Sequence, residues 1–482
     1  MALLAIVIAA AASAFAHLSV PTNVPQAQAA FDHGLFLYYA YNGDEAVRDF
    51  TQAATLDPHL GMAYWGIALA NGPDLNTPIT QERFTAAADA VRKAAAMGAA
   101  ATPLEQGLIA AMALRYKGIF ADWASDDQAY RAAMLALAES SHDENTELLA
   151  AEALLEHGGL EWSNGSPADE DSRAAMQLVE GVLRDDPPSV MANHLCIHLY
   201  DLAPDRTPAS PCAQRLDATT FPPEAEHLAH MPAHYWIEIG NYAAAERSSD
   251  RAYALMEDEL QRGADSPHTQ HYQKHDVAVG YSAAMMLANY ADAQRWSGRM
   301  TAAFGQSFDA LTALRFGRYD AAYDADANQF ARQSVRGLAA LQLGHSAEAR
   351  TLAKGVAANP TQGYLPQFFL AAFAETQGNY DEALRWLEQA HLNQQTGLGG
   401  ELIPWIPAGE ALGNLALRRK DDAAAVSAFE ATLQAYPNDP RALYGLSEAL
   451  AAEGKTTEAA TTRSRFQEMW KGADTSIDDA LP

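Results

Sequence analysis

Apolar residues recur every three or four positions along nearly the whole chain, often within alanine-rich stretches. This spacing places them on one face of an α-helix, where they can pack against a neighbouring helix. We find no convincing run in which apolar and polar residues alternate as they would in a half-buried β-strand. The pattern therefore predicts an all-α protein.

The helical pattern also repeats along the chain. Small residues stand 34 positions apart in three pairs, which are Gly344 and Gly378, Ala349 and Ala383, and Ala425 and Ala459. A fixed period of this length is typical of arrays in which each helix pair buries its apolar face by stacking on the next pair. The sequence therefore predicts an extended solenoid.

Two segments carry the residues by which the chain resembles the tetratricopeptide family. That family places small residues where the two helices of a unit cross, an aromatic residue in the wedge between helices, and a proline after the second helix. The segment from Ile406 has Gly413, Ala425, Phe429 and Pro437 at these places, and the segment from Ala27 has Gly34, Ala46, Phe50, Ala53 and Pro58. The resemblance covers residues 27–70, 170–300 and 310–465, and the repeat register of 71–170 stays open.

The resemblance implies a right-handed α-solenoid of helix pairs, with helical insertions and a concave groove. The runs DPHLGMAYWGIALA and HLAHMPAHYWIEIGNY are similar to an exported bacterial branch of the family with a histidine-rich HxxHMPxH segment. Proteins of this kind commonly serve as interaction modules, so a peptide, a protein or a small molecule is expected in the groove. The resemblance supplies no reaction.

The N-terminus has the features of an export signal. Residues 1–16 contain no charged side chain, and Ala14-Phe15-Ala16 has the small-x-small form of a cleavage site. The apolar run is shorter than the ~20 residues that a membrane span needs. We therefore expect cleavage after Ala16 and a periplasmic or secreted protein, with an uncleaved anchor as the alternative. Beyond the signal we expect one helical array over 17–300, a second over 301–470 and a disordered tail over 471–482.

Charge narrows the classes of partner. The formal net charge is -29 at pH 7, and the acidic residues are spread along the chain. Nucleic acids and anionic membrane surfaces attract basic patches, so neither is an expected partner.

The two cysteines, Cys196 and Cys212, are sixteen positions apart. In an oxidising compartment this pair is expected to form one disulfide closing a short loop. The alternative is two reduced thiols. Neither cysteine lies in a C-x-x-C motif, which argues against a thiol redox site.

Histidines are concentrated in one part of the chain. Eight of the 15 histidines fall between His194 and His275. By the tetratricopeptide register, several of them lie on first helices whose side chains face the groove, and His194 and His198 share one helix face at i, i+4 spacing. The predicted metal ligands or their immediate partners are His194, His198, His227, His230, His234, His275 and Asp201. Pro232 suggests that a helix starts near Met231, which would leave His227 on the preceding loop.

Imidazole-rich sites suit zinc, copper or iron. Two other interpretations stay open: a polar groove of mutually hydrogen-bonded imidazoles, and a histidine-lined pocket for an anionic or small organic ligand. No H-E-x-x-H, G-x-S-x-G, P-loop or G-x-G-x-x-G motif stands out, so hydrolase and nucleotide chemistry have no support.

Two function classes follow from these features. The first is an exported binding scaffold with a transition-metal site in its groove, and the second is a copper- or iron-dependent oxidoreductase that uses the same site. An open coordination position would favour the enzyme.

Overall fold

The computed structural model describes residues 16–97, 101–156, 162–263, 267–325, 327–329, 331–358, 363–397 and 405–477. Apart from Ala16, the predicted signal segment lies outside these residues. Contacts divide the chain into two compact units. Unit 1 is Met1–Pro232 with Ala254–Tyr272, and unit 2 is Ala233–Tyr253 with Gln273–Pro482.

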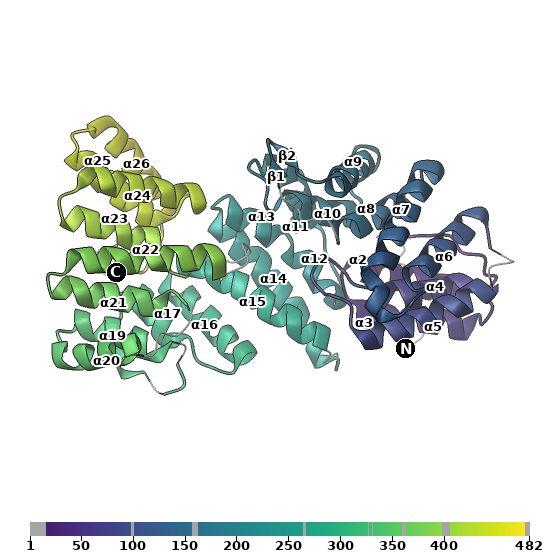
Figure 1. The fold of residues 1–482 in the computed structure, drawn as a ribbon, viewed down its shortest axis with the longest axis horizontal. Helices are drawn as coiled ribbons and strands as arrows, with labels where there is room; N and C mark the ends of the chain where they lie inside the picture. The colour runs from purple at the N-terminus through teal and green to yellow at the C-terminus, as the bar shows by residue number, and fades with distance from the viewer. Residues whose placement is uncertain are drawn as a thin grey trace. The chain divides into compact units, whose positions relative to one another are not determined.

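Both units are built from α-helices, which confirms the predicted all-α solenoid class (Figure 1). The first part of the chain forms α2 (Pro25–Tyr39), α3 (Gly43–Leu56), α4 (Gly61–Ala70), α5 (Gln81–Met97), α6 (Pro103–Arg115), η2 (Phe120–Asp122), α7 (Trp123–Ser141), α8 (Glu144–Leu155), α9 (Glu170–Asp185), α10 (Val190–Tyr200), η3 (Thr207–Ala209), α11 (Ser210–Ala218), η4 (Pro223–Ala225) and α12 (Glu226–His230). The strands β1 (Trp162–Ser163) and β2 (Ser166–Pro167) pair antiparallel in a short hairpin.

The rest of the chain forms α13 (Pro232–Glu238), α14 (Tyr242–Gln261), α15 (Pro267–Met286), α16 (Tyr290–Phe304), α17 (Asp309–Arg315), α18 (Tyr319–Asp324), α19 (Arg332–Gln342), α20 (Ser346–Ala358), α21 (Leu365–Thr376), α22 (Tyr380–Gly397), α23 (Ala408–Arg418), α24 (Asp422–Ala435), α25 (Pro440–Ala452) and α26 (Thr456–Met469). Residue 300, the predicted boundary between two arrays, lies within α16. None of the described helices combines the length and the apolar character needed to cross a membrane.

Polar residues define where many helices begin. The side chains of Asn42, Asp143, Asp169, Ser189, Asn289, Asp421 and Asp439 each accept a hydrogen bond from a first-turn amide. At α6, Thr102 and Glu105 form a complete capping box. Each cap satisfies an amide that the helix itself leaves without a partner.

Aromatic residues wedge between helices at the predicted crossings. In unit 2 the ring of Phe429 is fully buried between Gly413 and Gly445, and an added Cβ would lie 2.5 Å and 2.2 Å from the ring. In unit 1, Phe50 fills the same place between Gly34 and Gly66, at 3.0 Å and 2.4 Å. The small residues therefore allow close approach of the helices, as the repeat pattern predicts.

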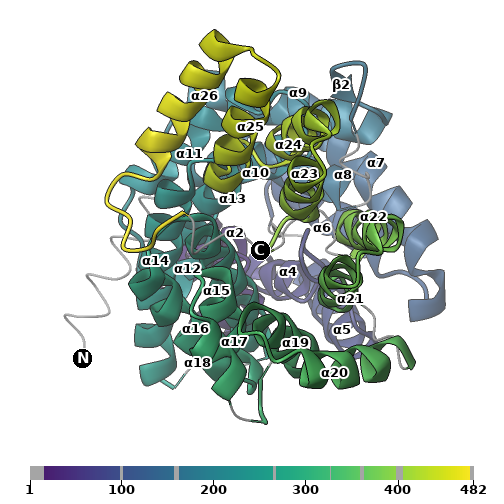
Figure 2. The ribbon, with the colours of Figure 1, turned by 90° about the vertical axis from the view of Figure 1, so that its left-hand side faces the viewer.

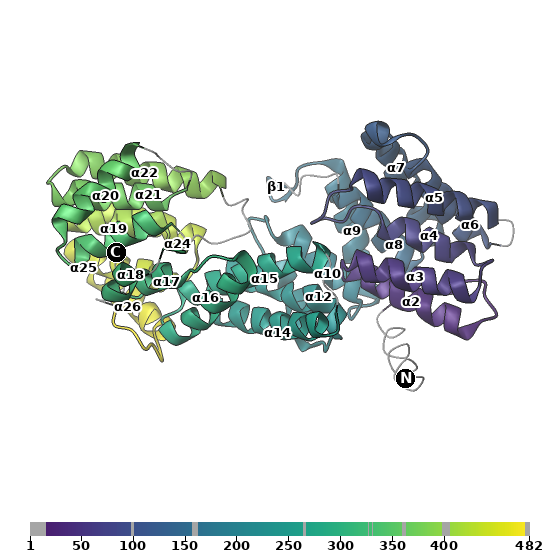
Figure 3. The same cartoon turned by 90° about the horizontal axis from the view of Figure 1, so that it is seen from below.

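In unit 1 successive helices lie side by side along the array. Figure 3 shows α2, α3, α4 and α5 packed against one another in chain order. The stretch over 71–170, whose repeat register the sequence left open, continues the array with α5 to α8.

Unit 2 curves until its end meets its beginning (Figure 2). The Tyr242 hydroxyl donates to the Pro437 carbonyl at 2.8 Å, and Asn438 Nδ2 donates to the Ile239 carbonyl at 3.5 Å. Gly240 has a positive φ of 73°, and an added Cβ would lie 1.8 Å from the Pro437 carbonyl oxygen. No side chain would fit at Gly240, where the two ends of the unit meet.

Candidate metal centre

Three short helices carry most of the predicted ligands, and the longer α15 carries His275. Ser189 caps α10 by accepting from the Ala192 amide, and α10 then presents His194 and His198 one turn apart. α12 carries His227, and α13 starts at Pro232 after a break at Met231. The predicted helix start near Met231 is therefore observed, but His227 lies in a helix rather than on a loop.

In unit 1, three imidazoles converge on one point. His194 Nε2 lies 3.1 Å from His198 Nε2 and 3.1 Å from His227 Nε2. One ligand atom of each ring lies within 4.8 Å of the other two. His194 and His227 are fully buried, whereas His198 is half-buried. We call these three residues the His triad.

The hydrogen bond on the far side of His194 fixes its tautomer. Its Nδ1 lies 3.0 Å from the Tyr39 carbonyl oxygen. Because a carbonyl can only accept, Nδ1 carries the proton, and Nε2 of the neutral ring presents a lone pair. This arrangement, in which the outer nitrogen donates to a backbone carbonyl, is the usual support of a metal-binding histidine.

The two imidazole contacts of His194 Nε2 compete for one lone pair. The single lone pair on His194 Nε2 faces two other ring nitrogens and can accept well from only one of them. A cation can bind all three nitrogens at once. Zinc–nitrogen bonds of ~2.0–2.1 Å in a tetrahedral site separate the ligand atoms by about 3.3 Å. The observed separations of 3.1 Å are close to that value.

Two tyrosines flank the triad. The ring centroid of Tyr41 lies 4.4 Å from that of His194 and 5.3 Å from that of His227, and Tyr272 lies 4.5 Å from His227. Tyr41 adopts a positive φ of 56° where α2 ends. The Asn42 amide bonds to the Leu37 carbonyl and the Tyr41 amide to the Tyr38 carbonyl, which completes a Schellman motif. Glycine usually takes this position, whereas here a buried tyrosine takes it and packs against two rings of the triad.

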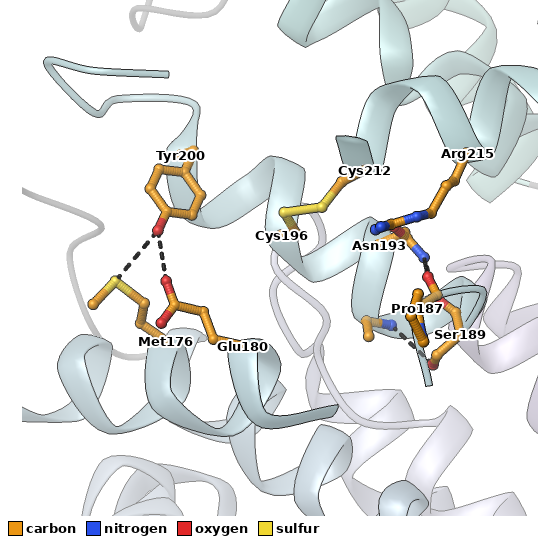
Figure 4. The surroundings of a disulfide bond; sticks show 10 residues. Met176, Glu180, Pro187, Ser189, Asn193, Cys196, Tyr200, Cys212 and Arg215 are labelled. Carbon is orange, nitrogen blue, oxygen red and sulfur yellow. Dashed lines mark hydrogen bonds between the residues drawn. A yellow bond between two sulfur atoms is a disulfide. The ribbon is translucent and has the colours of Figure 1, made fainter. Parts of the chain in front are cut away.

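A disulfide and a polar bridge hold α10 against α11. Cys196 and Cys212 are bonded and buried, and Figure 4 shows the bond joining the two helices. Arg215 Nη1 donates to Asn193 Oδ1 at 3.2 Å, and Asn193 Nδ2 donates to the Pro187 carbonyl at 2.8 Å. Cys196 lies between the two triad residues of α10, so these links restrain the helix that carries them.

The remaining predicted ligands lie elsewhere. His230 ends α12, and its ring centroid is 6.3 Å from that of His227. Asp201 caps the C-terminus of α10, and the group of converging ligand atoms does not include its carboxylate. In unit 2, His234 Nε2 lies 3.1 Å from His275 Nε2, with the two rings stacked. The structure therefore groups His227, rather than His230, with His194 and His198.

Sequence reasoning missed the contributions of Tyr39, Tyr41 and Tyr272. The Tyr39 contact is made by a backbone carbonyl, which no side-chain pattern reveals. For Tyr41 there was a signal, because a helix that ends before Tyr41-Asn42-Gly43 places a large residue where glycine is usual.

No family model matches this chain, and no curated protein matches it in sequence. Solved structures do match over almost the whole chain. Cut9 from the APC/C hetero-tetramer Cut9–Hcn1 is 13% identical with a TM-score of 0.34, covering 95% of this chain and 90% of that one. Human IFIT1, solved as a dimer with PPP-AAAA, is 14% identical with a TM-score of 0.32 and coverages of 91% and 90%. Yeast Tom70 is 12% identical with a TM-score of 0.29 and coverages of 94% and 93%.

Proposed function

We propose that this protein is an exported, tetratricopeptide-like binding scaffold that holds a transition-metal ion on His194, His198 and His227. One observation carries the metal assignment. The Nε2 atoms of His198 and His227 both lie 3.1 Å from His194 Nε2, whose lone pair is set by the bond to Tyr39. Zinc, copper and iron are the metals that such nitrogen ligands suit.

The other predicted ligands have lesser roles in this proposal. His230 lies at the end of α12 and Asp201 at the end of α10, on the helices that carry the triad. The facing imidazoles of His234 and His275 offer two further nitrogen donors in unit 2.

The proposed scaffold would bind its partner in unit 2. A pocket there is lined mainly by apolar residues of successive helices, among them Leu338, Phe368, Ala371, Leu387, Ile406 and Ala411. Arg418 and Glu375 pair at its border through two bonds of 2.6 Å and 2.9 Å. A pocket of this composition suits a peptide, a protein segment or a small molecule with an apolar surface.

The number of histidines in the triad supports an enzymatic alternative. Three protein ligands leave a fourth position for water or substrate, as in catalytic rather than closed structural sites. The second candidate is therefore a copper- or iron-dependent oxidoreductase that uses the same triad. Zinc as the native ion would argue against it.

Metal analysis of untagged protein purified from the exported fraction tests the metal site. We expect one equivalent of zinc, copper or iron in the wild-type protein and none after His227→Ala substitution. If the untagged protein takes up no metal after equilibration with all three ions, the proposed metal site is wrong and the triad is a cluster of hydrogen-bonded imidazoles. Intact mass of the same sample tests export, because cleavage after Ala16 removes sixteen residues and a retained Met1 would contradict it.

A further inference from the structure

The pocket of unit 2 opens into the hydrophobic core of that unit. Most of its apolar lining residues belong to one cluster of buried side chains, among them Leu314, Phe368, Leu387 and Ile406. The space between the lining residues is about 690 Å³, including its open mouth, which is a size typical of small-molecule sites. Water is held poorly between apolar walls, so the pocket favours an apolar occupant.

Three charged side chains also line the pocket, and each has a partner of opposite charge. Arg315 donates from Nη1 and Nη2 to the two carboxylate oxygens of Glu410 at 2.6 Å and 2.8 Å, and from Nε to the Met285 carbonyl at 3.3 Å. Burial raises the pKa of Glu410, but the Arg315 guanidinium outweighs burial and lowers it, so Glu410 is ionised. Arg418 and Glu375 pair with each other through two bonds. Among the described lining residues, no charge is therefore left to attract an ion.

These ion pairs disfavour a charged occupant. A carboxylate or phosphate group would have to displace a glutamate from its arginine, and the Arg315–Glu410 pair is fully buried. Breaking such a pair leaves an uncompensated buried charge, which is strongly destabilising.

A peptide backbone is disfavoured for a different reason. Its amide groups would lose their hydrogen bonds to water on entering the pocket, and they would need new partners there. Besides the paired ions, the described lining offers polar groups only from Tyr319 and Gln342. The pocket thus suits a molecule that brings few hydrogen-bonding groups.

We propose that this pocket binds a small, uncharged, mostly apolar molecule with one hydrogen-bonding group directed at Gln342. The inference rests on the proposed scaffold function and narrows its partner to one chemical class. Gln342 is exposed and lines the pocket, so its amide lies at the mouth, where it can donate to or accept from the polar group of the ligand. The apolar body of the ligand then fills the space beside Phe368 and Leu387.

Two probes of equal size test this inference. At neutral pH β-naphthol is uncharged and has one hydroxyl group, whereas β-naphthoate has the same ring system and a carboxylate. In calorimetric titrations of the mature chain we expect β-naphthol to bind at a single site and β-naphthoate to bind roughly tenfold more weakly or not at all, because its charge finds no counter-charge in the pocket.

Substitutions locate the binding. Ala372→Phe places a ring in the pocket from a half-buried position on α21 and should abolish β-naphthol binding. Gln342→Leu should weaken β-naphthol binding about fivefold and leave the binding of naphthalene, which has no hydroxyl group, unchanged. The matched control is Gln333→Leu, which removes an exposed glutamine of α19 that does not line the pocket and should change neither affinity. Thermal unfolding without ligand checks that each variant is folded.

Each outcome bears on a different claim. If β-naphthoate binds as tightly as β-naphthol, the ligand is not restricted to uncharged molecules, and the inference is overturned while the pocket remains the binding site of the scaffold. If β-naphthol binds Ala372→Phe and Gln342→Leu as well as it binds wild type, it binds outside this pocket, which also overturns the inference. If wild-type protein binds neither probe, the scaffold function proposed for this pocket fails as well. Metal binding by the His triad is measured separately and does not depend on these results.

Discussion

The Nδ1–H group of His194 donates to the backbone carbonyl of Tyr39, the last residue of α2, at 3.0 Å. The final carbonyls of a helix have no partner within it, so this bond satisfies α2 while it orients the imidazole. Residues 155 positions apart in the chain are joined in this way. One hydrogen bond therefore serves both the fold and the candidate metal site.

Removing His194 should abolish stoichiometric metal binding. The His194→Ala substitution deletes the central nitrogen of the triad and leaves the Tyr39 carbonyl without its donor. We expect the variant to retain no metal after gel filtration, as measured by elemental analysis. His59→Ala, an exposed substitution in the same unit, is the control and should leave binding unchanged. Equal behaviour of the two variants would refute the ligand assignment.

Loss of the disulfide should weaken both the fold and the site. Replacing Cys196 and Cys212 by alanine releases α10 from α11, and a closed loop of this length contributes ~3 kcal/mol to the free energy of unfolding. Because α10 carries two triad residues, metal affinity should fall as well. Urea unfolding and metal titration measure the two effects. Reduction of the wild-type protein should reproduce them, and reduction of the double variant should have no further effect. Two free thiols in exported protein would contradict this prediction.

His33 should make stability depend on pH in the alkaline range. Burial alone lowers its pKa, but hydrogen bonds to Asp49 and Glu224 outweigh burial and raise the pKa to about 9. The folded pKa thus lies above the ordinary value of 6.5, so the stabilisation is complete below pH 6.5 and is lost as the pH rises through 9. Glu224 lies in η4, which ends at Ala225 directly before α12, and this bridge therefore helps to fix the helix that carries His227.

The His33→Gln variant isolates this contribution. At pH 6 it should be less stable than wild type by on the order of 2–3 kcal/mol in urea unfolding. Above pH 9 the difference should nearly vanish. A constant difference across this range would show that His33 contributes by packing alone.

Replacing glycine by alanine should lower stability at a helix crossing but not at an ordinary helix position. Gly445→Ala places a Cβ 2.2 Å from the fully buried Phe429 ring and should destabilise the protein by about 2–3 kcal/mol. Gly181→Ala lies within α9 with nothing within 4 Å of the new Cβ, so it should be neutral or stabilising by up to ~1 kcal/mol. Thermal unfolding of both variants checks the contrast. Similar changes in the two would contradict the crossing role.

Local sequence patterns predicted the helices and their crossings well. Phe429 with Gly413 at the repeat spacing indicated the wedge that the structure contains, because that packing depends on residue size at fixed intervals. The grouping of the histidines was harder to predict. His227 lies in α12 and its Nε2 atom approaches that of His194, so His227 joins the triad. The expected helix start near Met231 placed His227 on a loop and favoured His230, whereas His227 lies in α12.

Contacts between segments far apart in the chain could not be predicted from the sequence. The meeting of Gly240 with Pro437 depends on the accumulated rotation of several helix pairs, and each pair alone resembles its neighbours. The Tyr39 carbonyl is a backbone group, which every residue possesses. Only the three-dimensional structure shows which backbone carbonyl accepts a hydrogen bond from a site residue.

Because unit 2 closes on itself, it should tolerate the gain or loss of a whole repeat poorly. An open array tolerates gain or loss of a repeat, because each repeat contacts only its neighbours. Here the Tyr242 hydroxyl donates to the carbonyl of Pro437, 195 residues later. Inserting or deleting one helix pair would rotate and shift Pro437 away from Tyr242, and this contact would be lost. The number of repeats in this unit is therefore fixed by geometry. The same long-range contact should make the unit fold in a single cooperative step that is slower than that of an open array of equal length.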